Sequence, residues 1–515
     1  MTFVDKINDL QDKKQKLELG GGKERIATQH EKGKLTARER INKLFDEGSF
    51  VEVGTFAETS CIDFDMQKKK APGDGVVTGY GTINGRPVFA AAQDFTVIAG
   101  SLGGMHAKKI VNVMNMAAKT GAPFIALNDS GGARIEEGVE ALGGYGDIFK
   151  MNTMLSGVVP QITVIMGPCA GGASYSPALS DFVFMVENTA QMFITGPSVI
   201  QAITGEEVTM DELGGAKIHT TKSGNAHRSF ENEDQCFDGI KKLLSFLPDN
   251  NLAGLPQYEC TDSLNRTAEA IYDLIPEGKS GYDVKSLILQ IVDNADIFEI
   301  HPDFAQNVVT CFARINGKTV GIVANQPNVK AGCLDIDASD KAARFVRFCD
   351  SFNVPLVTLT DVPGYLPGKD QEYDGIIRHG AKLLYAFSEA TVPKINVITG
   401  KAYGGAYIAM NSKHLGADIV YAWPSAEIAV MGPDGAANII FRKDIKDSSD
   451  PVQTRKDKIQ EYTDKVTNPY VAASKGFVDD IIDPAQTRQY VAAALEMLSS
   501  KSEARPKKKH GNIPL

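Results

Sequence analysis

The chain has 515 residues, of which 43% are hydrophobic and 23% are charged, and its formal net charge is −10. A chain of this length exceeds one ordinary hydrophobic core, so two domains are expected. The acidic balance argues against a nucleic-acid partner. No run approaches the roughly 20 apolar residues of a membrane span, and the polar N-terminus is unlike a signal peptide. These features favour a cytoplasmic protein.

The seven cysteines give no sign of a metal or redox site. They are scattered, and no pair has the C-x-x-C spacing of a zinc ribbon or a redox centre. We therefore expect reduced cysteines in core positions and no bound metal.

The N-terminal residues, up to about position 45, are expected to form a separate segment on the surface of the first domain. Within it, Asp5–Leu19 has the pattern of an exposed helix that ends at the three glycines Gly20–Gly22.

An internal repeat organises most of the remaining chain. The triplet Ile83–Gly85 recurs as Ile315–Gly317, a shift of 232 residues. Other matches keep this shift or exceed it by a few residues, as small loop insertions would produce. They are Ala99–Leu102 with Ala331–Leu334, Pro123–Asp129 with Pro355–Asp361, Gly171–Ala173 with Gly404–Ala406, and Gly196–Pro197 with Gly432–Pro433. Duplication of one domain is the economical explanation.

Both copies alternate short apolar strands with helices. Pro123–Leu127 and Ile162–Met166 have the pattern of buried strands, whereas Met105–Ala118 and Asp340–Ser351 have helical periodicity. This alternation predicts a layered α/β fold. The turn residues of Pro248–Pro256 predict a linker, which places the domains at residues 1–254 and 255–515.

Glycine-rich corners are the main candidate site. In each copy a strand runs into a turn at Asn128–Arg134 or Thr360–Tyr365, and a later strand runs into Gly167–Ser174 or Gly400–Tyr407. Glycines let a ligand approach the backbone, and the N–H groups at the start of the next helix point outward. Two such corners side by side would form an oxyanion hole. Because the corners recur in register, this interpretation is favoured over glycines that only allow close packing.

Other catalytic motifs are absent from the sequence. It contains no P-loop, no dinucleotide-binding glycine motif and no nucleophile elbow. Ser130 lies beside the corner glycines but has no histidine near it in sequence, which disfavours a serine hydrolase. Distant histidine partners remain open, and the candidates are His106, His219, His227 and His379.

Several long segments resemble the carboxyltransferase subunits of biotin-dependent acyl-CoA enzymes. This family includes propionyl-CoA carboxylase beta chains, the transcarboxylase subunit that handles methylmalonyl-CoA, and the methylmalonyl-CoA decarboxylase alpha subunit. The resemblance covers essentially the whole chain. It implies two crotonase-like domains of repeated β-β-α units and a homohexamer built as a trimer of dimers. The segments are Gly33–Arg40, Asp129–Glu137, Gly167–Ser176, Gly400–Met410, Trp423–Glu427, Met431–Pro433 and His510–Asn512.

The resemblance also implies which domain binds which substrate. The N-terminal domain would bind acyl-CoA, with Gly171 and Gly172 holding the thioester oxygen as it becomes an enolate. The C-terminal domain of the dimer partner would bind biotin, with Gly405 and Ala406 holding the ureido oxygen. A biotin nitrogen would act as the base, so no protein acid–base pair is required. Further contacts would come from Ser130, Gly131, Gly132 and Ala133 on the acyl side, and from Gly364, Tyr365, Gly404 and Tyr407 on the biotin side.

Substrate recognition rests on fewer residues. Two groups of basic residues are candidates to bind the CoA phosphates: the cluster Lys34, Arg38 and Arg40, and the pair Lys108–Lys109. Arg38 is our candidate in the first group. A role in surface salt bridges competes with phosphate binding for each of these residues. Ile408 is the predicted specificity position. An apolar side chain there discriminates one methylene by only about 1–3 kcal/mol. Methylmalonyl-CoA and propionyl-CoA are the expected substrate pair.

The sequence has no Met-Lys-Met biotinylation site. Biotin is therefore expected on a separate carrier protein, with a biotin carboxylase or a membrane decarboxylase subunit as a further partner. Such a partner could hold the chain at the membrane periphery. The direction of carboxyl transfer depends on these partners. The alternatives are a stand-alone crotonase-type hydratase or hydrolase and a non-catalytic scaffold for the carrier.

Overall fold

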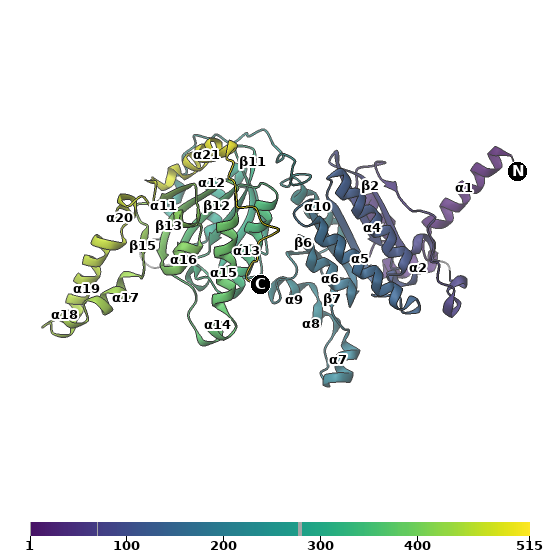
Figure 1. Ribbon diagram of the computed structural model, residues 1–515, viewed down its shortest axis with the longest axis horizontal. Helices are drawn as coiled ribbons and strands as arrows, with labels where there is room; N and C mark the ends of the chain where they lie inside the picture. Colours follow the sequence, from purple (N-terminus) through teal and green to yellow (C-terminus); the bar gives the residue numbers. More distant parts are fainter. Residues whose placement is uncertain (1, 70, 277–280) are drawn as a thin grey trace. The chain divides into compact units, whose positions relative to one another are not determined.

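Each half of the chain forms its own eight-stranded sheet with helices packed along it. The computed structural model describes residues 2–69, 71–276 and 281–515. The chain divides into two compact units between Ala253 and Gly254, here called unit 1 and unit 2. Figure 1 shows the strands of each unit with their flanking helices.

Unit 1 contains strands β1 to β8 and helices α1 to α10. Its strands are β1 (Val51–Glu52), β2 (Val76–Ile83), β3 (Arg86–Gln93), β4 (Phe124–Ser130), β5 (Gln161–Ala170), β6 (Phe182–Val186), β7 (Gln191–Phe193) and β8 (Arg228–Phe230). Its helices are α1 (Phe3–Glu18), α2 (Lys23–Glu31), α3 (Ala37–Leu44), α4 (Gly104–Thr120), α5 (Val139–Leu155), α6 (Gly172–Leu179), α7 (Pro197–Thr204), α8 (Met210–Gly214), α9 (Ala216–Thr221) and α10 (Glu233–Leu244).

Unit 2 contains strands β9 to β16 and helices α11 to α21. Its strands are β9 (Ile297–Ile300), β10 (Val308–Ile315), β11 (Lys318–Asn325), β12 (Leu356–Val362), β13 (Lys394–Tyr403), β14 (Ile419–Ala422), β15 (Glu427–Ala429) and β16 (Asp480–Ile481). Its helices are α11 (Ala270–Leu274), α12 (Val284–Ile291), α13 (Ile336–Ser351), α14 (Lys369–Tyr373), α15 (Ile376–Glu389), α16 (Gly404–Ala409), α17 (Pro433–Ile440), α18 (Arg442–Lys446), α19 (Pro451–Tyr462), α20 (Pro469–Ser474) and α21 (Thr487–Met497). Of the helices in the described residues, none is both long and apolar enough to cross a membrane.

The two sheets have the same strand order. Unit 1 follows β1-β2-β3-β4-β5-β6-β8 with β7 on β5, and unit 2 follows β9-β10-β11-β12-β13-β14-β16 with β15 on β13. The register is also repeated, because Val76 pairs with Gln93 and Val308 pairs with Asn325. The α/β fold and the internal duplication are therefore confirmed strand by strand.

The repeated Asn-Gly pair explains the first hairpin of each sheet. Asn84 (φ 50°) and Gly85 (φ 75°) join β2 to β3 in the left-handed region, which a two-residue hairpin turn requires. The backbone N–H groups of both residues donate to the carboxylate of Asp46, at 2.9 Å each. In unit 2, the turn at Asn316–Gly317 donates in the same way to Asp293.

The core of each unit lies between its sheet and the helices that follow the hairpin. In unit 1, Val113 of α4 and Ile148 of α5 pack with Phe124 and Ile165 of the central strands. The central parallel strand β5 is apolar and buried along most of its length, as strands covered on both faces are. This burial fixes where β4 and β5 end, and therefore where the corners form.

A buried lysine occupies the same position on the long helix that follows the hairpin in each unit. Lys109 of α4 donates to the carbonyl oxygens of Gly73 at 2.8 Å and Val76 at 2.5 Å. Lys341 of α13, 232 positions later, donates to the carbonyl oxygens of His301 and Phe304 at 2.8 Å each. Burial lowers the pKa of Lys109 to about 8 and that of Lys341 to about 7. The duplication thus includes a buried lysine that is hydrogen-bonded to backbone oxygens, as well as the apolar core.

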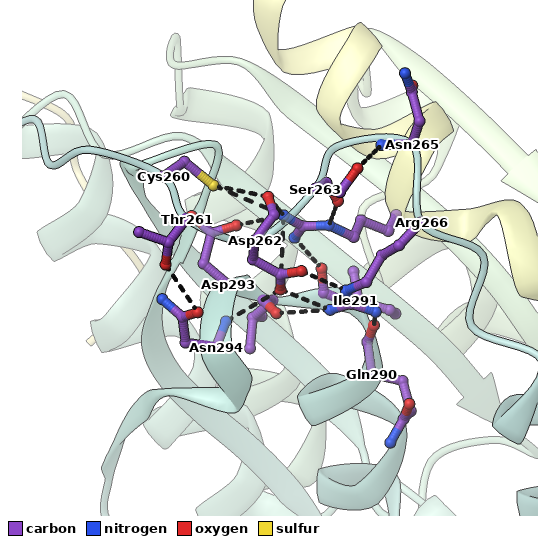
Figure 2. A network of polar contacts seen from close by, with 12 residues as sticks. Cys260, Thr261, Asp262, Ser263, Asn265, Arg266, Gln290, Ile291, Asp293 and Asn294 are labelled. Atoms are coloured by element: carbon purple, nitrogen blue, oxygen red, sulfur yellow. Dashed lines mark hydrogen bonds and ion pairs between the residues drawn. The ribbon is translucent and has the colours of Figure 1, made fainter.

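A buried arginine of α21, Arg488, is bonded to the segment that precedes β9, the edge strand of the unit 2 sheet. The guanidinium of Arg488 donates to the carboxylate of Asp293 at 2.6 Å and to the carbonyl oxygen of Ile291 at 2.7 Å. Arg266 forms a bidentate pair with Asp262 at 2.7 and 3.0 Å. Figure 2 shows Asp262, Arg266 and Asp293 within this network. It joins residues that are almost 200 positions apart, because Arg488 and Asp293 are separated by 195.

Removing the Arg488 guanidinium is expected to destabilise unit 2. In Arg488→Met, Asp293 stays buried without its cation, and losing one member of a buried pair costs about 3–5 kcal/mol. Urea unfolding can be followed through Trp423, the single tryptophan, whose indole N–H donates to Thr487 beside Arg488.

The matched control is Lys318→Met, which removes an exposed pair with Glu496 in the same unit. Its effect should stay within about 1 kcal/mol. Equal unfolding midpoints for the Arg488 variant and the unchanged protein would contradict the assignment of this network as a structural anchor.

Candidate functional site

Two turns of unit 1 lie together because they follow neighbouring parallel strands. β4 and β5 pair from Phe124 with Gln161 to Asn128 with Ile165, and the register shifts before Ser130 pairs with Cys169. The chain turns at residues 130–133 after β4 and at residues 171–173 after β5. Strands that run in one direction bring their ends to the same edge of the sheet. We call these two turns together the unit 1 corner.

Ser130 has a structural role in this corner. Its side chain is buried, and its hydroxyl donates to the carbonyl oxygen of Gly100 at 2.7 Å. The same hydroxyl accepts the N–H of Gly132 at 3.1 Å. A hydroxyl held in this way shapes the turn and is not presented as a nucleophile.

The histidines do not form a catalytic pair with Ser130. The His106 ring is hydrogen-bonded to the carbonyl oxygen of Asp74, and the His219 ring to the carbonyl oxygen of Met192. The His379 ring is hydrogen-bonded to the Asp340 carboxylate. The His227 ring accepts the Val183 N–H. The serine hydrolase interpretation is therefore not supported. Within the described residues, no three His, Cys, Asp or Glu side chains gather as metal ligands would.

The first turn leaves one backbone donor open. The N–H of Gly131 donates to Ala99 oxygen at 2.9 Å, and the N–H of Leu102 donates to Gly132 oxygen at 2.9 Å. Ala133 lies between these bonds. Its N–H has no hydrogen-bond partner in the part of the chain that the structure describes.

The second turn presents the start of α6. Gly171 has φ 59° and ψ −124°, a left-handed conformation that favours glycine, and its N–H donates to Phe193 oxygen at 3.1 Å. Gly172 and Ala173 are the first two residues of α6, where backbone N–H groups have no partner within the helix. Of the predicted donors Gly171 and Gly172, the Gly171 N–H is thus already bonded, whereas Gly172 lies at the helix start. The reason is the pairing of β7 with β5, which continues onto the Gly171 amide.

The unit 2 corner consists of residues 362–365 after β12 and 404–407 after β13. Gly404 has φ 59°, as Gly171 has, and α16 begins there. Gly405 and Ala406 lie in the first turn of α16, where backbone N–H groups have no partner within the helix. These two residues occupy the positions that Gly172 and Ala173 occupy in unit 1, 233 residues earlier. Both corners thus offer the same pair of amides.

Tyrosines line the unit 2 corner. The Tyr365 ring lies 4.0 Å from where a Cβ on Gly405 would be, and burial raises the pKa of Tyr365 to about 12. The hydroxyl of Tyr403 donates to the Glu427 carboxylate. The buried hydroxyl of Tyr407 has no partner among the described residues. Ile408, the next residue, is 37% exposed.

Gly364 provides the bend in the first turn of this corner. Its carbonyl oxygen accepts the N–H of Leu334 at 3.1 Å, and the N–H of Leu366 donates back to Leu334 oxygen at 2.7 Å. A Cβ on Gly364 would meet no atom within 4 Å in the described structure. The open space beside it is where the prediction places a ligand.

Most of the basic residues that were candidates for binding the CoA phosphates already form ion pairs or hydrogen bonds with other residues of the protein. Lys34 and Arg40 are buried and paired with Asp129, and Lys109 is buried against carbonyl oxygens. Arg38 forms a bidentate pair with Glu52 at 2.7 and 3.2 Å and keeps a quarter of its side chain exposed. Within the cluster Lys34, Arg38 and Arg40, the charges of Lys34 and Arg40 are therefore used inside the protein, and Arg38 is the member that keeps an exposed part. Lys108 is exposed.

Known proteins resemble this chain along its whole length. A family model of the carboxyl transferase domain matches residues 28–513. The methylmalonyl-CoA decarboxylase subunit alpha of Propionigenium modestum is 59% identical over 99% of this chain and 99% of its own length. The methylmalonyl-CoA carboxyltransferase 12S subunit of Propionibacterium freudenreichii subsp. shermanii is 57% identical over 100% of this chain and 98% of its own length.

The fold also matches a solved relative. The structure of transcarboxylase 12S, a hexamer core with methylmalonyl-coenzyme A and methylmalonic acid bound, has a TM-score of 0.98 and 57% identity to this chain. The match covers 100% of this chain and 99% of that one. The predicted crotonase-like fold is therefore confirmed. The chain belongs to the carboxyl transferase family, the family of biotin-dependent acyl-CoA carboxyltransferase subunits.

Proposed function

We propose that this chain moves a carboxyl group between methylmalonyl-CoA and biotin carried on a separate protein. In one direction, the bond between C2 of methylmalonyl-CoA and its carboxyl carbon breaks, and a bond from that carbon to a biotin nitrogen forms. The proton of that nitrogen passes to the thioester enolate, which gives propionyl-CoA. The observation that carries the proposal is the pair of duplicated corners, each presenting two open backbone amides.

The unit 1 corner is proposed to hold the acyl-CoA thioester oxygen. Gly172 and Ala173 present their N–H groups at the start of α6, and Ala133 presents a third from the adjacent turn. A helix start also carries partial positive charge, which favours an anion. Donors fixed before the reaction stabilise the enolate, and one of them can be worth about 3–4 kcal/mol of barrier.

The unit 2 corner is proposed to hold the ureido oxygen of biotin. Gly405 and Ala406 supply the donors, and Gly364, Gly404, Tyr365 and Tyr407 surround them. When carboxybiotin loses its carboxyl group, negative charge develops on the ureido oxygen, and the same backbone chemistry serves that charge. Ile408 follows Tyr407 and is proposed to contact the acyl end, where its apolar side chain suits a short chain.

The carboxylates near the unit 1 corner are poor candidates for a hydratase base. Asp129 is paired with Lys34 and Arg40. Glu137 accepts from the Arg134 guanidinium at 2.7 Å and from the Gly104 N–H at 2.6 Å. A crotonase-type hydratase would need a free acid–base pair here. The carboxyl transfer needs none when the biotin nitrogen takes the proton.

The partners follow from the chemistry. Biotin on a carrier protein must reach the unit 2 corner, and a biotin carboxylase or a membrane decarboxylase subunit sets the direction of transfer. The hexamer of the transcarboxylase 12S relative supports a hexameric assembly of this chain. We place the protein in the cytoplasm, where a membrane decarboxylase subunit, if that is its partner, would hold it at the membrane periphery.

The direct test mixes the purified chain with free biotin and methylmalonyl-CoA and measures propionyl-CoA. We expect product that depends on biotin and disappears when avidin sequesters it. Acetyl-CoA, which has no carboxyl group to lose, is the control substrate and should stay unchanged. Folded protein that forms no biotin-dependent propionyl-CoA would refute the proposed function.

The separate roles of the two corners can be tested with one methyl group. A Cβ at Gly172 would lie 2.7 Å from Tyr145 Cδ2, so Gly172→Ala displaces the helix start. Turnover should fall about a hundredfold or more, as on loss of an oxyanion donor. A Cβ at Gly405 meets only Tyr365, at 4.0 Å, so Gly405→Ala should fold normally and raise the KM for biotin.

The control for both variants is Gly146→Ala on α5, because a Cβ there meets nothing within 4 Å in the described structure. It should leave both KM values unchanged. Equal changes in the KM for biotin and for acyl-CoA in the Gly405 variant would contradict the division of roles.

A further inference from the structure

A buried carboxylate separates the two turns of the unit 1 corner. Asp129 is the residue before Ser130 in β4, and its side chain is fully buried. A Cβ on Gly167 of β5 would lie 1.9 Å from Asp129 Oδ1, so the carboxylate fills the space beside that glycine. The β4–β5 register shifts at this point. Asp129 therefore fills the irregularity between β4 and β5 just before both turns.

The partners of Asp129 come from the N-terminal segment, outside the sheet. Lys34 Nζ lies 2.8 and 2.9 Å from the two carboxylate oxygens, and an Arg40 nitrogen lies 2.9 Å from Oδ2. Gln29 donates to Oδ2 at 3.0 Å. Arg40 also pairs with Glu233 at 2.7 and 2.9 Å. Two cations thus balance two carboxylates in a buried cluster.

Unit 2 repeats the carboxylate without the cations. Asp361 fills the same space beside Gly400, and its N–H donates to Asn325 as the Asp129 N–H donates to Gln93, at 3.2 Å in both units. The Asp361 carboxylate accepts the Lys401 N–H at 2.9 Å. It forms no salt bridge with any residue in the described ranges. Burial raises its pKa, and the hydrogen bond from the Lys401 N–H and the charge of Lys401 only partly oppose that rise.

Both corners must accept negative charge, and they meet this demand in different ways. Burial raises the pKa of Asp361 and so disfavours its charged form, whereas Asp129 is paired with two cations. A buried carboxylate without a counter-ion would oppose an enolate forming a few residues away. Lys34 and Arg40 cancel this charge and hold the carboxylate in one place. A small displacement of a preorganised donor is costly, since a misplacement of about 1 Å can reduce turnover about a hundredfold.

We propose that Lys34 and Arg40 are positioning residues of the unit 1 corner, which act through Asp129 and keep its amides aligned for the enolate. The N-terminal segment from residue 29 to residue 40 is then part of the catalytic apparatus of unit 1. The enolate part of this inference rests on the proposed function. The alignment of the amides does not, and it can be measured without substrate.

The test compares Lys34→Met with the charge-conserving Lys34→Arg and with Lys43→Met. Lys43 lies on α3 in the same segment, and its pair with Asp234 is exposed. In the ligand-free protein, Lys34→Met should speed hydrogen exchange at the bonded amides of the unit 1 turns and leave residues 362–366 and 404–407 unchanged. These amides are those of Gly131, Arg134, Gly171 and Ser174. Lys34→Arg should restore most of the protection, and Lys43→Met should behave as the unchanged protein.

Kinetics supply the second readout. In the assay with free biotin, Lys34→Met should lower kcat for methylmalonyl-CoA about tenfold to a hundredfold with the KM for biotin unchanged. A folded Lys34→Met protein with unchanged exchange at the unit 1 corner, or with equal changes in both corners, overturns the inference. If the unchanged protein itself shows no biotin-dependent turnover, the proposed function fails, while the exchange result still decides the inference. Should Lys34→Met not fold, Gln29→Leu removes one contact to Asp129 and is expected to give a smaller change of the same kind.

Discussion

The structure depends on one constraint: two neighbouring parallel strands must part at their ends and leave backbone amides without partners. In both units the register of the two strands shifts at a buried aspartate, Asp129 or Asp361, beside a glycine that has no side chain to fill the space. A glycine with φ 59°, Gly171 or Gly404, stands at the start of the following helix, whose first N–H groups have no partner within the helix. The hairpin, the covering helices and the buried lysines hold the strands that end there. The carboxyl transfer that we propose then needs little more than the backbone amides of the two corners.

Much of this could be predicted from the sequence. The constant shift of 232 residues predicted a repeated register, and β2–β3 and β10–β11 show it residue by residue. The recurring Ile-Asn-Gly triplet marked corresponding positions of the two copies, and the structure shows that it forms the hairpin turns, where few residues accept positive φ at both positions. The corner glycines predicted turns where strands run into helices, and the structure has turns at these positions in both units. These signals are local, or they repeat in register, which is why a single sequence reveals them.

The remaining features depend on contacts between distant residues. The Gly171 amide is occupied because β7 returns to β5, and nothing near Gly171 in sequence indicates that pairing. Lys34 and Arg40 looked like surface cations, since charged residues are rarely buried without a partner. Their partner Asp129 lies 95 and 89 residues away. The same holds for Arg488 and Asp293. Long-range ion pairs leave no periodic pattern, so the sequence could supply the residues but not the pairing.

The most direct test of this account is a structure of the protein with an acyl-CoA and biotin bound. We predict the thioester oxygen within about 3 Å of the Gly172 amide, with Ala173 or Ala133 as the second donor, and the biotin ureido oxygen at the amides of Gly405 and Ala406. Asp129 should remain paired with Lys34. A thioester oxygen bound away from the unit 1 corner, or biotin bound away from the unit 2 corner, would contradict the assignment of separate roles to the two copies.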